Sequence, residues 1–325
     1  MSEAAAILND DEDVSPAKRN YLKWVYYTAL FFFSFFVFFL FTFPYGVVKE
    51  SIVGEISQAT GLNIRVKEVG PSFPIGVDAE ELKISTQDGL AQVEFRSVDV
   101  TVSILPLFIG KVKVNAELVS KNKGVIDASA SFGILQLISR DMVPSSIYLE
   151  AKDFELGPIV TLALREKSKT ANELVKDLMN QITFVGNLTG KTELKLASSE
   201  PIQSTGVVDL QLKKASLSIN NPNLTLARQV FEKGLIKANL ANGKLSIDPN
   251  SALNSQELKV GFKGNSVLRN PLENSLLDFV IALKLEGTLK DNFGFTMSFM
   301  GGNDQGVNYT INGTLSRPNF QGSPN

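Results

Sequence analysis

The chain has 325 residues, a formal net charge of −2 and a hydrophobic content of 44%. It contains no cysteine and no histidine, which excludes disulfides, thiolate nucleophiles, Ser-His and Cys-His pairs and the usual zinc sites. We therefore expect no enzymatic activity, and we predict no catalytic, cofactor-binding or metal-ligating residue.

Charge is distributed unevenly along the chain. All five acidic residues of the first 23 precede the first basic residue, Lys18, and this stretch is predicted to be a disordered cytoplasmic tail, residues 1–23. After Pro44 the chain is balanced, with 29 basic side chains (32 less three) and 29 acidic ones (34 less five). A balanced domain has no electrostatic footprint for nucleic acid, so none is expected as a partner.

Residues 24–45 are predicted to form a transmembrane helix. The stretch from Trp24 to Phe43 contains no charged residue, and about 20 residues at a rise of about 1.5 Å cross a hydrocarbon core of about 30 Å. A cleaved signal peptide is the alternative, but its apolar region would be only about 7–15 residues long and would need a small-residue cleavage site. Pro44-Tyr45-Gly46 supplies no such site. The candidate membrane-anchor residues are Trp24, Phe31, Phe36, Phe39 and Phe43.

The basic residues next to this segment predict its direction. Lys18, Arg19 and Lys23 immediately precede it, whereas the residues just after it have mixed charge. By the positive-inside rule the amino terminus is cytoplasmic and the carboxy-terminal domain is exported. In a Gram-negative cell this describes a single-pass protein of the inner membrane with a periplasmic domain.

The exported part is predicted to be mainly β, with antiparallel, curved or sandwich-like modules. Residues 46–61 form an amphipathic linker helix that ends at Gly61. A first β module (62–157) and a second (183–320) flank a helical interruption (158–182), and residues 321–325 form a disordered tail.

Alternation of apolar and polar residues predicts the strands, since it indicates an antiparallel sheet with one face buried. A change of phase between Phe95 and Val98 predicts a bulge. The runs that alternate are Leu62–Val66, Val98–Ile104, Val112–Leu118, Val208–Leu212, Ile236–Leu240, Phe279–Leu285 and Phe293–Phe299.

The apolar face of these strands has the most functional potential. Two sheets can close on each other and hide it as a core, or one curved sheet can leave it as an open groove suited to acyl chains. We favour the closed core.

Several short segments resemble the protein N component of type II secretion systems (GspN), in its delta-proteobacterial type, with a wider similarity to AsmA-like proteins. They are Phe43-Pro44, Gly61-Leu62-Asn63-Ile64, Gly70-Pro71-Ser72-Phe73-Pro74-Ile75-Gly76-Val77, Leu105-Pro106-Leu107, Gly110-Lys111-Val112 and Ile311-Asn312-Gly313-Thr314-Leu315-Ser316-Arg317-Pro318. The resemblance implies an accessory subunit of the inner membrane that faces the periplasm, and it carries over no catalytic residue.

The expected function is therefore non-enzymatic: assembly or scaffolding contacts in a type II protein secretion system. The expected partners are the inner membrane and other subunits, either the secretin or the inner-membrane platform, with lipid as a further possibility. The alternative is an AsmA-like protein that handles lipid or maintains the outer membrane through an apolar groove. An anchored enzyme that uses only Ser, Lys, Asp or Glu is the third alternative.

Overall fold

The structure is a computed structural model, and it describes residues 21, 23–28, 30–31, 34–35, 38, 42, 45–139, 143–169, 173–197, 199–221, 224–299, 302–303 and 306–324. The chain forms two compact units, Met1–Val48 and Lys49–Asn325. In the first unit, the described residues between 21 and 42 are helical. Helix α2 (Tyr45–Thr60) runs from the first unit into the second.

Helix α2 ends at a glycine in the left-handed conformation. Gly61 has φ +70°, and its N–H donates to the carbonyl of Ser57 at 2.9 Å. This geometry satisfies a carbonyl of the last helical turn and turns the chain into the first strand.

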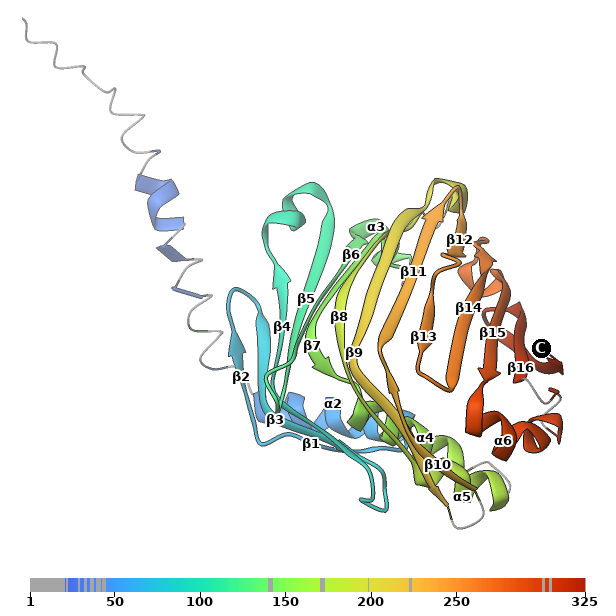
Figure 1. Ribbon diagram of the computed structural model, residues 1–325. Helices are drawn as coiled ribbons and strands as arrows, with labels where there is room; N and C mark the ends of the chain where they lie inside the picture. Colours follow the sequence, from blue (N-terminus) through green and yellow to red (C-terminus); the bar gives the residue numbers. More distant parts are fainter. Residues whose placement is uncertain are drawn as a thin grey trace, which may run out of the picture. The chain divides into compact units, whose positions relative to one another are not determined.

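The second unit consists of one antiparallel sheet and a few helices (Figure 1). Its strands are β1 (Asn63–Arg65), β2 (Glu68–Ser72), β3 (Gly76–Ser85), β4 (Gln92–Ser103), β5 (Lys111–Ser120), β6 (Val125–Gly133), β7 (Ser146–Glu155), β8 (Ile182–Lys195), β9 (Thr205–Asn221), β10 (Leu224–Phe231), β11 (Lys233–Ala241), β12 (Lys244–Ile247), β13 (Ala252–Asn254), β14 (Leu258–Val267), β15 (Leu276–Leu285), β16 (Gly306–Thr314) and β17 (Arg317–Pro324). Its helices are η1 (Leu105–Ile109), α3 (Ile134–Ile138), α4 (Gly157–Ser168), α5 (Glu173–Gln181), η2 (Pro201–Gln203), η3 (Leu272–Asn274) and α6 (Gly287–Phe299).

The strands follow one another as an up-and-down meander. From β3 to β9, and again from β14 to β17, each strand pairs with the next one in sequence. Several strands are short and pair side by side with the same neighbour: β1 and β2 both pair with β3, and β10 and β11 both pair with β9. Strands β12 and β13 both pair with β11 on one side and with β14 on the other. Because β7 pairs with β8, the two groups of strands predicted as separate modules form one sheet.

The bulge predicted between Phe95 and Val98 is confirmed. The register between β4 and β5 shifts between Phe95 and Ser97, so Arg96 is the extra residue. On the neighbouring strand Glu81 has φ +49°, and the pairs with β4 pass from Glu80 directly to Leu82. The shift restores the apolar residues of both strands to one face.

The register divides the sheet into one face without charge and one charged face, because directly paired residues share a face. One row of the first face reads Val77, Val100, Ala116, Ala128, Leu149, Thr192, Val208, Ala238 and Ile247. The neighbouring row on the other face reads Asp78, Asp99, Glu117, Asp127, Glu150, Lys191, Asp209 and Lys237. The first face continues through Leu253, Val260, Leu283 and Val307 to the far edge of the sheet.

Three expectations from the sequence are wrong. The closed sandwich is not formed, because the described strands all join one sheet, which leaves no second sheet to pack against. Phe293–Phe299 was expected as a strand but belongs to α6, where Leu289 and Phe293, four residues apart, pack on the sheet. The expected disordered tail, residues 321–325, continues as strand up to Pro324, because residues 321–324 extend the ladder with β16.

Candidate functional site

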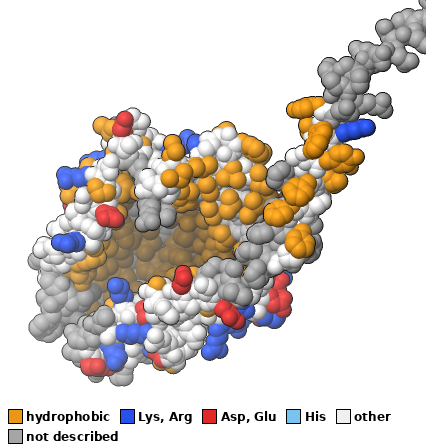
Figure 2. Space-filling view, turned by 180° about the vertical axis from the view of Figure 1, so that it is seen from behind, with side chains coloured by type: hydrophobic (Ala, Val, Ile, Leu, Met, Phe, Trp, Pro, Cys, Tyr) orange, Lys and Arg blue, Asp and Glu red, His pale blue; other side chains and the backbone are white. Residues whose placement is uncertain are grey.

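The charge-free face lines a hollow in the second unit. Figure 2 shows this hollow from behind, with hydrophobic side chains covering its floor and wall. We call this concave face the apolar trough; its middle is formed by Ala116, Ala128, Leu149, Val208 and Ile236, from five different strands.

Helix α4 covers one end of the trough. Ile159 and Leu162 of α4 pack against a cluster of buried residues from β4 and β7. Phe95 and Phe154 form its centre, with their rings stacked at a centroid distance of 6.3 Å. The cluster therefore holds α4 against one end of β3, β4, β7 and β8.

Helix α6 covers the same end of the trough over other strands, β14 and β15. Its residues Leu289 and Phe293 pack with Leu258 and Leu285, the residues where β14 begins and β15 ends. The start of α6 is held by Glu257, whose Oε1 accepts the backbone N–H of Thr288 at 2.9 Å and whose carboxylate also accepts the hydroxyl of Thr288. These hydrogen bonds lower the pKa of Glu257, since they favour its ionised form.

Away from the helices the trough is incompletely covered. The five residues that form its middle are each half-buried, whereas Phe154 and Leu285 under the helices are buried. A closed core would bury them all, so the middle of the trough stays accessible. Among the described trough residues away from the helices, the apolar side chains of Ala238 and Leu240 are buried. Accessible apolar surfaces of this kind are typical of binding sites in other proteins.

Two strands of the trough contain a glycine in a backbone conformation that side chains disfavour. Gly190 of β8 has φ +141° and Gly264 of β14 has φ +124°, both in the region that side chains disfavour. A Cβ at Gly264 would lie 2.1 Å from the carbonyl oxygen of Asp278, and one at Gly190 would lie 2.1 Å from that of Asp209. These close backbone approaches need glycine, as at the bends of other curved sheets.

The opposite face of the sheet carries ion pairs between side chains of neighbouring strands. The paired groups are Lys83 and Lys121 with Glu94, Lys152 with Asp127 and Glu150, Lys191 with Glu150, Lys237 with Asp209, and Lys259 and Lys284 with Glu286. This face is therefore adapted to water, in contrast to the trough.

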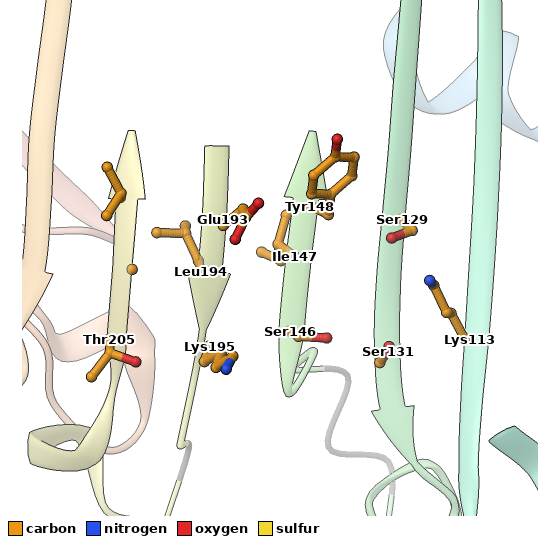
Figure 3. Close-up of a pocket in the computed structure, with 12 residues that line it drawn as sticks. Lys113, Ser129, Ser131, Ser146, Ile147, Tyr148, Glu193, Leu194, Lys195 and Thr205 are labelled. Carbon is orange, nitrogen blue, oxygen red and sulfur yellow. The ribbon is translucent and has the colours of Figure 1, made fainter. Parts of the chain in front are cut away.

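A shallow depression of about 490 Å³ lies on the polar face, over β5 to β9 (Figure 3). Lys113, Ser129, Ser146, Tyr148 and Lys195 are among the polar side chains that line it. The hydroxyl of Tyr148 donates to Glu150 at 2.8 Å, which raises the pKa of Tyr148 and lowers that of Glu150. The depression offers hydrogen-bonding groups in a hydrated setting. In the part of the chain that the structure describes, no cluster of His, Cys, Asp and Glu could hold a metal ion.

The membrane-anchor and topology residues predicted from the sequence belong to the first unit. Lys23, Trp24 and Phe31 are helical and exposed. The others lie outside the described residues: Lys18, Arg19, Phe36, Phe39 and Phe43. Among the residues that the structure describes, no helix has both the length and the apolar composition that crossing a bilayer requires. The span over residues 24–45 stays a prediction.

The sequence indicated the apolar face but not the residues that delimit the site. It missed the covering role of α6, although the spacing of Leu289 and Phe293 was a helical signal. The absence of charge at every trough position from β3 to β17 was readable once the register was known.

A comparison of the chain with protein families, with curated proteins and with solved structures finds no match. What the chain does is therefore inferred from its own sequence and geometry.

Proposed function

We propose that the chain is a membrane-anchored, non-enzymatic protein that binds the acyl chains of lipids in its apolar trough. The observation that supports this proposal is a concave face, free of charged side chains, that stays half-exposed where no helix covers it. The hydrophobic effect favours filling such a surface with hydrocarbon, by about 0.8 kcal/mol for each methylene group removed from water.

The dimensions of the trough suit an extended hydrocarbon chain. Strands β5, β14 and β15 each have 10 residues, and at about 3.3 Å per residue the trough measures about 33 Å along a strand. An acyl chain lying along or across the strands would meet uncharged and mostly apolar side chains, while its headgroup would stay in water.

The rest of the proposal concerns location. The uncharged segment from Trp24 to Phe43 anchors the chain in the inner membrane, and Lys18, Arg19 and Lys23 keep the amino terminus in the cytoplasm. The sheet then works in the periplasm, where it binds lipid from a membrane.

Mass spectrometry of the purified full chain tests the proposal. The expected result is phospholipid or fatty acid bound at close to one equivalent or more, retained after removal of excess detergent. Ala128→Asp should lose this lipid, whereas Ser129→Asp on the opposite face should keep it. Wild-type protein that carries no lipid, and takes up none when it is offered, would refute the proposal.

The second candidate function is the accessory role in a type II secretion system, in contact with the secretin or the inner-membrane platform. The observation that favours it is that two segments carrying the GspN resemblance, residues 61–64 and 70–77, both lie along β1, β2 and β3 at one edge of the sheet, towards opposite ends of β3. Partners that add a strand there would meet Pro71, which has no N–H to donate, so contacts through side chains are favoured over strand addition.

Deleting the gene and measuring secreted protein tests this second function. A loss of secretion, restored by the wild-type chain, and copurification with the secretin or platform subunits would support it. Unchanged secretion together with unchanged assembly of the secretion complex would contradict it.

A further inference from the structure

Large apolar side chains project into solvent along one end of the sheet. Phe73, Leu105, Phe108, Leu135, Ile138 and Ile202 are exposed by 68% to 83%, and we call this set the apolar rim. Such exposure exceeds that of any residue in the middle of the trough, and these side chains contribute little to the folded core.

The strand directions bring the rim residues to the same end. They lie in four connections, between β2 and β3, β4 and β5, β6 and β7, and β8 and β9, which are every second connection of this part of the chain. In an antiparallel meander alternate connections share an end, and these are alternate connections. Figure 1 shows η1 and α3 at this end, and α4 and α5 at the other. The chain also begins its first strand at the helix end, because Asn63 pairs with Ser85, the last residue of β3.

The turns at the helix end have a different composition. The turn between β3 and β4 contains Gln87 and Asp88, and the turn between β5 and β6 contains Lys121, Asn122 and Lys123. Leu90 is the exposed large apolar residue of these two turns. Exposed apolar residues are therefore concentrated in the connections at one end of the sheet and are not spread evenly over all its connections.

Two of the rim connections are held in a fixed shape. Gly110 ends η1 in the left-handed conformation (φ +72°), and its N–H donates to the carbonyl of Leu107 at 3.1 Å. Its own carbonyl accepts the N–H of Ile134, the first residue of α3, at 3.0 Å. The backbone thus presents Leu105 and Phe108 beside Leu135 in adjacent connections instead of letting them fold back on the sheet.

Positive charge accompanies the rim. Lys111, Lys195, Lys244, Arg269 and Arg317 are exposed at the ends of strands on this side, and none forms an ion pair with a described carboxylate. Seven other lysines of the polar face form ion pairs, whereas Lys113 and Lys263 there form none with a described carboxylate. The described acidic residues in the connections at this end of the sheet, Glu200 and Glu273, are fewer than these five cations.

We propose that the apolar rim inserts into an anionic lipid surface, with Phe108 and Leu135 in the boundary between headgroups and acyl chains and the rim cations against phosphate groups. Aromatic and aliphatic side chains next to exposed Lys and Arg are the composition that binds anionic bilayers. This inference goes beyond the proposed function and does not depend on lipid in the trough.

Charge selects the lipid surface over a second copy of the chain. Two rims in contact would oppose their unpaired cations, and like charges in apposition disfavour association. An anionic bilayer complements these cations and at the same time removes the apolar side chains from water.

The test uses the absence of cysteine in the natural chain. Phe108→Cys and, as a matched control in a turn at the helix end, Gln87→Cys are each labelled with the environment-sensitive dye NBD. The full chain is held in nanodiscs of phosphatidylcholine, and vesicles of phosphatidylglycerol mixed with phosphatidylcholine are added. The expected result is a blue shift and a gain in emission for the dye at position 108 and no change at position 87.

Variants quantify the two contributions. In the labelled background, Leu135→Ser should weaken vesicle affinity about tenfold or more, from lost burial of a leucine side chain. Lys111→Glu and Lys244→Glu should each weaken the affinity for anionic vesicles about fivefold or more, and added salt should also weaken it.

Three results would overturn the inference. The first is an unchanged spectrum at position 108 with anionic vesicles, for a chain whose circular dichroism shows the native β content. The second is a blue shift that grows with protein concentration in the absence of vesicles, since a second copy would then cover the rim. The third is an equal shift with pure phosphatidylcholine vesicles, which would remove the role of the cations. Ala128→Asp should leave the response at position 108 intact, so failure of the trough and failure of the rim are distinguishable.

Discussion

Replacing Ala128 by aspartate tests how the trough binds hydrocarbon. Ala128 lies on β6 between Ala116 of β5 and Leu149 of β7, on the charge-free face and away from the helices. It is half-buried, so a longer side chain there can extend into the trough without displacing a packed neighbour. The new carboxylate would keep its hydration shell and exclude hydrocarbon from the surrounding surface.

The magnitude follows from the length of chain excluded. If the hydrated carboxylate displaces about four methylene groups, at about 0.8 kcal/mol each, acyl-chain binding weakens by about 3 kcal/mol, or more than a hundredfold. Titration of the full chain with a fluorescent fatty acid measures this change directly.

Ser129→Asp is the matched control. Ser129 is the next residue of the same strand, and it faces the polar side between Asn115 and Tyr148. Its aspartate variant should bind the fatty acid as the wild type does. Equal affinities of the Ala128→Asp and Ser129→Asp variants, both shown to be folded by thermal melting, would refute the reasoning.

Three further predictions concern the structure that supports the trough. Gly264→Ala should destabilise the fold by about 1–3 kcal/mol in urea unfolding, because φ is +124° and the added Cβ meets a carbonyl oxygen. Gly261→Ala in the same strand, where the nearest atom would be 3.9 Å away, should be close to neutral; equal losses would contradict this account. Glu257→Gln should speed hydrogen exchange in residues 288–294, because the carboxylate no longer holds the start of α6, and an unchanged rate would show that the cap is unimportant. Lys121, and then Lys83, hold the pKa of Glu94 below its usual value, so Glu94 stabilises the fold above its unfolded pKa of about 4.3 and loses this effect as pH falls through the folded pKa. As pH falls, the urea concentration at the unfolding midpoint should therefore decrease less for Glu94→Gln than for the wild type. An equally steep decrease for both proteins would rule out this contribution.

Much of the β architecture could be predicted from period-two patterns. Runs such as Val98–Ile104 and Val112–Leu118 correspond to β4 and β5, because alternating branched side chains suit a strand with two different faces. The pattern did not single out β6, whose trough residues include Ala128 and Ala130; such small apolar side chains give a weak signal. It also misassigned α6, because a period of two from Phe293 to Phe299 hid the pair Leu289 and Phe293.

The open state of the trough could not be predicted from the sequence. Alternation is the same whether the apolar side of a strand packs against a second sheet or faces a groove. What decides between them is long-range pairing, and here β7 pairs with β8 across the helices α4 and α5, which keeps all the described strands in one curved sheet. The rim was equally hidden, since Leu105 and Phe108 read as ordinary apolar residues until the structure shows them exposed.

The central claim, that the concave face binds lipid, is tested most directly by photo-crosslinking in the native membrane. Val208 and Val207 are adjacent in β9; Val208 faces the trough, opposite Ala238, whereas Val207 faces the polar side, opposite Asn239. Benzoyl-phenylalanine at position 208 should form covalent adducts with phospholipid, and the same group at position 207 should not. Adducts at neither position, or equal yields at both, would contradict lipid binding in the trough.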